Sequence, residues 1–167
     1  MLTAVLWLGA GLLLYAGAVK MPVPDAAMAT LHKLRLPSGR TAARLLALGE
    51  MAVGATILLT GGLLATAVSS LTWGCLTVVA AVQRARHIDC ACFGVRRYPV
   101  SRLHVTLNAT LAGASLLGFA ARPWSLAAVQ ADAGPLGSVA TAVLLGTGVA
   151  LLMTMTRRAG LAEGARA

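Results

Sequence analysis

Charged residues are scarce in this 167-residue chain. Asp, Glu, Lys and Arg make up 11% of the sequence, whereas 58% of the residues are hydrophobic and the mean hydropathy is +0.81. A soluble domain of this size needs far more charge to cover its surface. No polar stretch is long enough to bury a core of its own. The composition therefore excludes a soluble globular domain and predicts a protein that lies in a lipid bilayer.

The chain also has no Lys or Arg ahead of its first apolar run, residues 2–19. A cleaved signal peptide begins with a basic segment, so we expect this run to be retained as a membrane helix. The next apolar run, residues 45–82, is too long for one crossing, and Gly61-Gly62 predicts a turn that divides it in two. Residues 103–121 and 136–156 complete the set.

Each of these five pieces is close to the roughly 20 residues that cross a hydrocarbon core as a helix. Helices satisfy their own backbone hydrogen bonds, which lipid cannot do. The predicted fold is therefore all-α, a polytopic membrane helix bundle with five spans.

The net charge of +9 does not indicate nucleic-acid binding, because the cations form no basic face interleaved with aromatic residues. Thirteen of the fourteen Lys and Arg fall in residues 20–44, residues 84–102 and the tail from Arg157, and the exception is Arg122. With five spans, these three places lie on one side of the membrane. The positive-inside rule predicts that this side is cytoplasmic and that the N-terminus is outside. Anionic lipid headgroups are the partner that this pattern implies.

The first connection between spans predicts a short helix of its own. Asp25 is the expected N-cap, and Met28, Leu31 and Leu34 recur at a spacing of three. This pattern is typical of an amphipathic helix in the membrane interface, which residues 37–39 would end. The alternative interpretation is a disordered basic loop.

Cysteine is scarce as well, with three residues in the chain. Cys75 falls inside the third span, where we expect it to act as a small apolar residue. Cys90 and Cys92 lie in a connection rich in Arg, and nearby cations lower the pKa of a thiol and make it nucleophilic. A disulfide between residues two apart closes a small, strained ring that is easily reduced. These features favour a reversible redox pair.

Two other interpretations of the cysteines stay open. The pair could be unreactive, either reduced or joined in a disulfide that closes too short a loop to stabilise the fold. It could also bind a metal together with His87 and His104. Zinc sites usually separate two cysteines by two to four residues, so zinc is the less favoured cofactor.

Glu50 is an ionisable residue inside an apolar run, a costly placement that usually marks a function. Counted from Leu45, it lies five residues, or about 8 Å, into the second span. Asn108 lies about as deep in the fourth span, and Lys20 closes the first. Connectivity places all three at the end of the bundle that carries Cys90. An ion pair between Glu50 and Lys20 and a role of Glu50 in proton transfer or ligand binding are compatible predictions.

These residues together resemble the MauE family of methylamine-utilisation membrane proteins, which are grouped with DoxX-like proteins. The resemblance rests on the Cys-x-Cys-Phe-Gly motif at residues 90–94, on Lys20, on Glu50 within Leu-Gly-Glu-Met-Ala-Val-Gly, and on Asn108. It covers roughly residues 1–120. We accordingly expect a MauE/DoxX-like four-helix domain at residues 1–121, followed by a fifth helix and a basic tail at residues 122–167.

The resemblance implies a membrane partner of a thioredoxin-fold protein that serves the maturation of disulfide-containing exported proteins. Cys90 and Cys92 would exchange electrons with this partner, and Glu50 would hold or relay protons. The predicted cofactor-binding residues are Lys20, Asn108 and Phe93. Similar four-helix oxidoreductases use a quinone, which is the candidate cofactor here. This chain lacks their second cysteine pair, which argues against an autonomous relay from quinone to substrate.

The resemblance implies a partner on the outer side, whereas the distribution of cations predicts that Cys90 faces the cytoplasm. We adopt the cytoplasmic side. Two further hypotheses remain: a non-catalytic membrane scaffold or chaperone for a maturation partner, and a metal-binding membrane protein.

Overall fold

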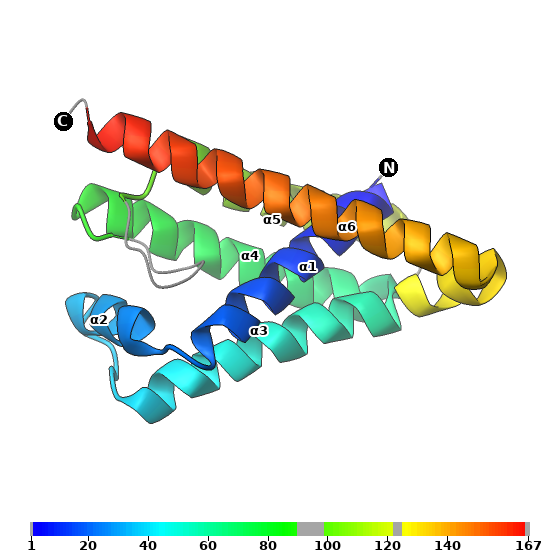
Figure 1. Ribbon diagram of the computed structural model, residues 1–167, viewed down its shortest axis with the longest axis horizontal. Helices are drawn as coiled ribbons and strands as arrows, with labels where there is room; N and C mark the ends of the chain where they lie inside the picture. Colours follow the sequence, from blue (N-terminus) through cyan, green and yellow to red (C-terminus); the bar gives the residue numbers. More distant parts are fainter. Residues whose placement is uncertain (1, 90–98, 122–124, 166–167) are drawn as a thin grey trace.

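The structure is a computed structural model that describes residues 2–89, 99–121 and 125–165. These residues form six α-helices, five of which are long and apolar enough to cross a membrane (Figure 1). The helices are α1 (Leu2–Lys20), α2 (Asp25–Lys33), α3 (Arg40–Thr60), α4 (Gly62–Ala85), α5 (Arg102–Ala121) and α6 (Leu126–Gly164). The predicted all-α membrane bundle with five spans is confirmed.

The turn predicted at Gly61-Gly62 separates α3 from α4. Both glycines have positive φ, 61° at Gly61 and 62° at Gly62. Glycine adopts this region readily because it has no Cβ to collide with the backbone. The long apolar run is therefore two antiparallel helices, as expected.

Helix α3 begins at Arg40, five residues before the predicted start at Leu45. Hydropathy misses this turn because it contains Arg40 and Arg44, whose long side chains are exposed and can extend toward lipid headgroups while the backbone stays helical. Glu50 is thus ten residues, or about 15 Å, from the start of its helix, and its depth of about 8 Å counted from Leu45 stays a prediction.

The last helix also begins earlier than predicted, at Leu126 instead of residue 136. Ser125 caps it by accepting a hydrogen bond of 3.1 Å from the backbone N–H of Ala128. A kink at Gly134, with φ 67° and ψ −178°, precedes Pro135 and separates a short first part from the spanning part. Gly134 and Pro135 thus mark the boundary between the two parts of α6.

The amphipathic helix expected in the first connection is present as α2, which packs against α3. The prediction that Asp25 is its N-cap is wrong. Pro24 occupies the N-cap position and Asp25 is the first helical residue, where its carboxylate still interacts favourably with the helix dipole. Leu34 follows the last helical residue as the C-cap.

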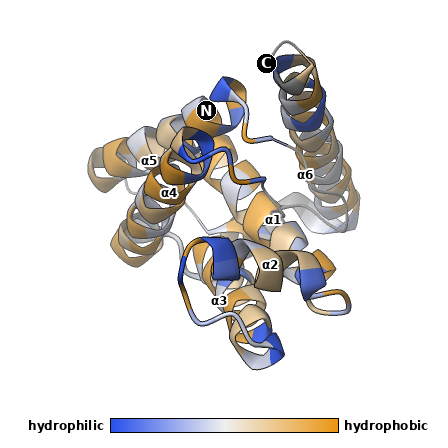
Figure 2. Cartoon of the chain, turned by 90° about the vertical axis from the view of Figure 1, so that its left-hand side faces the viewer, coloured by the Kyte–Doolittle hydropathy of each residue, from blue (hydrophilic) through white to orange (hydrophobic). Residues whose placement is uncertain are grey.

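Helix α1 lies in the centre of the bundle, with α3, α5 and α6 packed against it and α4 packed against α5 (Figure 2). Small residues let α1 approach α3 closely. A Cβ added at Gly54 would lie 2.7 Å from the Ala10 carbonyl oxygen, and one at Gly17 would lie 2.5 Å from that of Ala47. Membrane helices commonly pack through such small residues.

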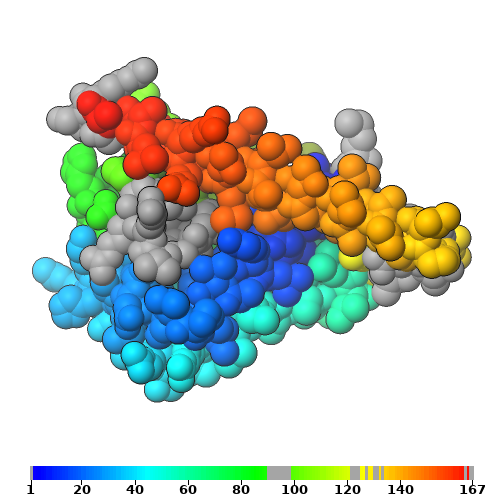
Figure 3. Space-filling view, viewed as in Figure 1, coloured from blue at the N-terminus to red at the C-terminus, as the bar shows by residue number. Residues whose placement is uncertain are grey.

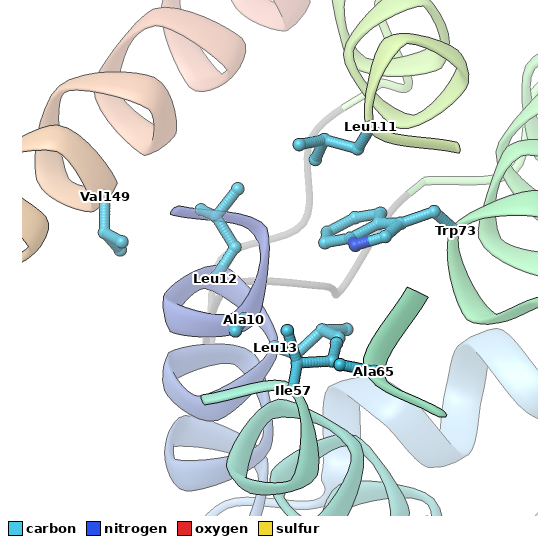
Figure 4. Close-up of a cluster of buried hydrophobic side chains, with 8 residues drawn as sticks. All are labelled: Ala10, Leu12, Leu13, Ile57, Ala65, Trp73, Leu111 and Val149. Carbon is cyan, nitrogen blue, oxygen red and sulfur yellow. The ribbon is translucent and has the colours of Figure 1, made fainter. Parts of the chain in front are cut away.

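The apolar core joins α1 to its neighbours through a cluster around Leu12, Leu13, Ile57, Trp73 and Leu111 (Figure 4). The share of buried residues falls from 44% in the span of α1 to 6% in that of α6. Helix α6 therefore lies at the periphery, along one side of α1 (Figure 3).

The connection that contains α2, the described parts of the α4–α5 connection and the end of α6 lie at the same end of the bundle (Figure 1). We call this the loop end. Seen from there, hydrophilic residues gather at the helix ends and in the connections, whereas the spans are largely apolar (Figure 2). The described parts of the cation-rich segments thus share one end, as predicted from connectivity.

Candidate functional site

A buried ion pair joins α1 to α3. The ammonium of Lys20 donates to both carboxylate oxygens of Glu50, with N–O distances of 2.6 Å. The side chains of Lys20 and Glu50 are 7% and 9% exposed. Two charges removed from water in this way stabilise each other only if the geometry is close and hydrogen-bonded, as it is here.

The pair lines a small cavity of about 40 Å³, which we call the inner cavity. Its polar lining consists of Lys20, Glu50, Gln83, His104 and Asn108. Trp73 and aliphatic residues of α1 and α4 form the rest of its surface. The volume is well below the roughly 300–1,000 Å³ of small-molecule sites but exceeds the roughly 10–15 Å³ that a water molecule needs.

Helix α5 supplies two of these polar residues from one face. Ser101 caps α5 by accepting a hydrogen bond of 3.1 Å from the backbone N–H of His104. His104 and Asn108 are four residues apart, so they lie on the same side of the helix. The Asn108 amide donates to the Leu76 carbonyl oxygen of α4 at 3.3 Å, which holds α5 to α4 beside the cavity.

A larger cavity of about 530 Å³, the outer cavity, lies at the loop end. Its polar lining consists of Gln83, Arg84, His87, Asp89 and Glu163. The carbonyl oxygen of Asp89 accepts a hydrogen bond from the Thr30 hydroxyl of α2 at 3.5 Å. Asp89 lines this cavity and directly precedes Cys90 in the sequence.

The end of α6 reaches the outer cavity through Glu163. The Arg84 guanidinium donates to its carboxylate at 2.7 Å and to the Val100 carbonyl oxygen at 3.1 Å. The backbone N–H of Arg102 donates to the same carboxylate at 3.0 Å. A carboxylate is favourable at this position because the N-terminus of α5 carries partial positive charge.

The structure brings together three of the six predicted site residues. Lys20, Glu50 and Asn108 line the inner cavity, as their positions in the spans predicted. Cys90, Cys92 and Phe93 lie outside the described residues, so their roles stay predictions. The roles of Lys20 and Asn108 toward a cofactor also stay predictions.

The remaining candidates occupy separate places. Cys75 is a free, exposed thiol on α4. His87 lines the outer cavity and His104 the inner one. Within residues 2–89, 99–121 and 125–165, no group of three or more His, Cys, Asp or Glu is placed to hold a metal ion.

Gln83 and Glu163 line the cavities but were not among the predicted site residues. Gln83 was excluded because the predicted span stopped at residue 82, whereas α4 continues to Ala85. Its signal is the spacing of Trp73, Leu76, Ala80 and Gln83, which places all four on the face of α4 that lines the inner cavity. Glu163 has no such signal, because 79 residues separate it from Arg84.

The fold and the buried pair define a polytopic helical membrane protein with a polar pocket near one end. The family described as "Methylamine utilisation protein MauE" matches residues 1–121, and the chain therefore belongs to the MauE family. This membership supports a membrane protein of methylamine utilisation. The matched residues include Lys20, Glu50 and Asn108 but not α6. No curated protein and no solved structure matches the chain.

Proposed function

We propose that the protein is a membrane thiol–disulfide redox component whose Cys90/Cys92 pair exchanges electrons with a thioredoxin-fold partner. One observation carries this proposal. Asp89, the residue before the pair, lines the outer cavity, and this cavity shares Gln83 with the inner cavity that contains Lys20 and Glu50. In the sequence, Cys90 and Cys92 thus come directly after a residue of this polar region, which also contains the buried carboxyl group of Glu50.

The exchange needs only the two thiols and a disulfide on the partner. One thiolate attacks a partner sulfur, which forms a mixed disulfide and releases one partner thiolate. The second thiolate then attacks the mixed disulfide, which closes the Cys90–Cys92 disulfide and releases the second partner thiolate. Two electrons pass to the partner, and the reverse sequence returns them. In this proposal the cations of the Arg-rich connection that contains the pair support the thiolate state.

In this proposal Glu50 holds or relays the protons that thiol and thiolate exchange. A carboxyl group can do so because it is stable in both protonation states, and Lys20 stabilises the ionised one. Maturation of an exported disulfide-containing protein is the process that we infer for the partner, in keeping with the family.

A scaffold that holds a maturation partner is the second candidate. The Lys20–Glu50 pair connects α1 to α3, and the Arg84–Glu163 pair connects α4 to α6. Ion pairs between helices are also what a rigid anchoring protein needs. Reversible oxidation of the cysteines distinguishes the two candidates, because only the redox component requires it.

We expect mild oxidation to remove two alkylatable thiols, those of Cys90 and Cys92, and to leave Cys75 reduced. The strained ring and the basic surroundings favour a reversible disulfide. Mass spectrometry after alkylation measures the oxidation. In cells, replacing each cysteine of the pair singly by Ser should trap a mixed disulfide with the partner in one of the two variants. Cys75→Ser is the matched control and should trap none.

Three thiols that stay alkylatable under these conditions would leave the scaffold as the better proposal. Stoichiometric zinc that is lost in Cys92→Ser would instead establish metal binding.

The cation distribution predicts that the segment with Cys90 faces the cytoplasm. In a chain with one cysteine at position 90, an impermeant maleimide should therefore label only after the cells are permeabilised. Arg122→Cys in a cysteine-free chain should react in intact cells. The opposite pattern, with rapid labelling at position 90 and protection at position 122, would reverse the assignment.

A further inference from the structure

The side-chain amide oxygen of Gln83, Oε1, is buried, and no donor reaches it in the part of the chain that the structure describes. The residue is 2% exposed and lies two residues before the end of α4. A buried acceptor without a donor carries a desolvation penalty. In native proteins such an acceptor is usually satisfied by an ordered water.

Gln83 also occupies a particular position between the two cavities. Of the described residues, it alone lines both the outer cavity of about 530 Å³ and the inner cavity of about 40 Å³. Gln83 therefore lies between the cavity at the loop end and the cavity that contains the Lys20–Glu50 pair.

The inner cavity is suited to water by its chemistry. Lys20, Glu50 and Asn108 offer it charged and polar partners, and a polar cavity of this size holds water where an apolar one stays dry. Leu12 and Leu13 of α1, which belong to the apolar cluster, also line this cavity (Figure 4). The polar residues of the lining come from four helices, α1, α3, α4 and α5.

We infer that Gln83 binds water at the junction of the two cavities and that this water gives Glu50 proton access from the loop end. A water molecule donates a proton to the Glu50 carboxylate and takes one from the next water, so no charge is left behind. The Gln83 carbonyl accepts a hydrogen bond from this water and is not itself protonated. The route goes beyond thiol exchange, because it exists whether or not Cys90 and Cys92 react.

The test follows hydrogen–deuterium exchange at the Glu50 carboxyl group. In the full-length Lys20→Met variant in proteoliposomes at pH 5, Glu50 has no cationic partner and carries a proton. Transfer to D₂O then shifts its C=O infrared band. The band is assigned by its loss in Lys20→Met/Glu50→Gln.

Adding Gln83→Met keeps the size of the side chain and removes the acceptor. We expect exchange to slow about tenfold, which corresponds to about 1.4 kcal/mol in the barrier. Gln83→Ser leaves room for water beside a polar group and should not slow exchange. Thr77→Val, which removes a polar group from α4 outside both cavities, is the matched control and should leave the rate unchanged.

If hydrogen–deuterium exchange at Glu50 is as fast with Gln83→Met as in the Lys20→Met protein that retains Gln83, the inference is overturned. Equal slowing in Gln83→Met and Gln83→Ser would do the same, because it would assign Gln83 a packing role. Circular dichroism verifies that each variant is helical. Since no cysteine takes part in the readout, a failed thiol assay and a failed exchange assay remain distinguishable.

Discussion

Lys20→Met is expected to destabilise the protein by about 3–4 kcal/mol at pH 7, which is the free energy needed to protonate an ordinary carboxyl group at that pH. The variant leaves the Glu50 carboxylate buried without its cation. An uncompensated buried charge is costlier still, so Glu50 takes up a proton instead. The estimate agrees with the roughly 3–5 kcal/mol typical of breaking a buried pair from one side.

The destabilisation caused by Lys20→Met should become smaller as the pH falls. At pH 7 Glu50 is protonated in the folded variant and ionised in the unfolded chain. Acidification therefore favours the folded state. Between pH 7 and pH 5 we expect a recovery of about 1.4 kcal/mol per pH unit relative to the parent protein. Denaturation of the protein in detergent micelles, followed by circular dichroism at both pH values, measures it.

Lys33→Met is the matched control, because Lys33 is exposed on α2. It should change stability little at either pH. Lys20→Met/Glu50→Gln should be more stable at pH 7 than Lys20→Met alone, because it has no buried carboxylate. A Lys20→Met protein as stable as its parent at pH 7 would show that the pair makes no net contribution.

Glu50→Gln should insert normally and lose thiol exchange. Gln keeps the size of the side chain and an acceptor for the Lys20 ammonium, which lies at the last residue of its helix. The substitution removes the negative charge of the pair and, with it, the ability to exchange a proton. General acid–base groups typically contribute about 10²–10⁴-fold to a rate, so the exchange rate should fall by at least about 100-fold.

The rate is measured as reduction of a disulfide on the partner captured by the cysteine variants. Asp25→Asn is the control, because it also neutralises one carboxylate but does so at the exposed start of α2. It should leave the rate unchanged. Full activity in a correctly inserted Glu50→Gln protein would show that Glu50 serves only as a contact between α1 and α3.

Properties that depend on one stretch of sequence were predictable. Apolar length determines how many helices cross, and the positive φ at Gly61-Gly62 explains why the long run turns there. The boundaries were less accurate where hydropathy and helicity differ, as at Arg40 and Leu126. Counting spans also placed Lys20, Glu50 and Asn108 at one end, because connectivity alone determines which helix ends are neighbours.

Contacts between distant segments were not predictable from those patterns. Span counting gives the depth of Glu50 but not the 2.6 Å distance to Lys20, which depends on the close approach of α1 and α3 at Gly17 and Gly54. The Arg84–Glu163 contact depends on how α6 lies against the bundle. The spacing of Gln83 places it on the inner face of α4, but its position between two cavities depends on how the helices pack.

The Arg84–Glu163 contact sets an order of events during synthesis. The chain emerges from the ribosome N-terminus first, so Lys20 can meet Glu50 as soon as the first two spans are in the bilayer. Glu163 lies in the last turn of α6 and therefore emerges long after every other described residue that lines the outer cavity. The inner cavity can thus be assembled while translation continues, whereas the outer cavity gains its last carboxylate only when the fifth span has been inserted.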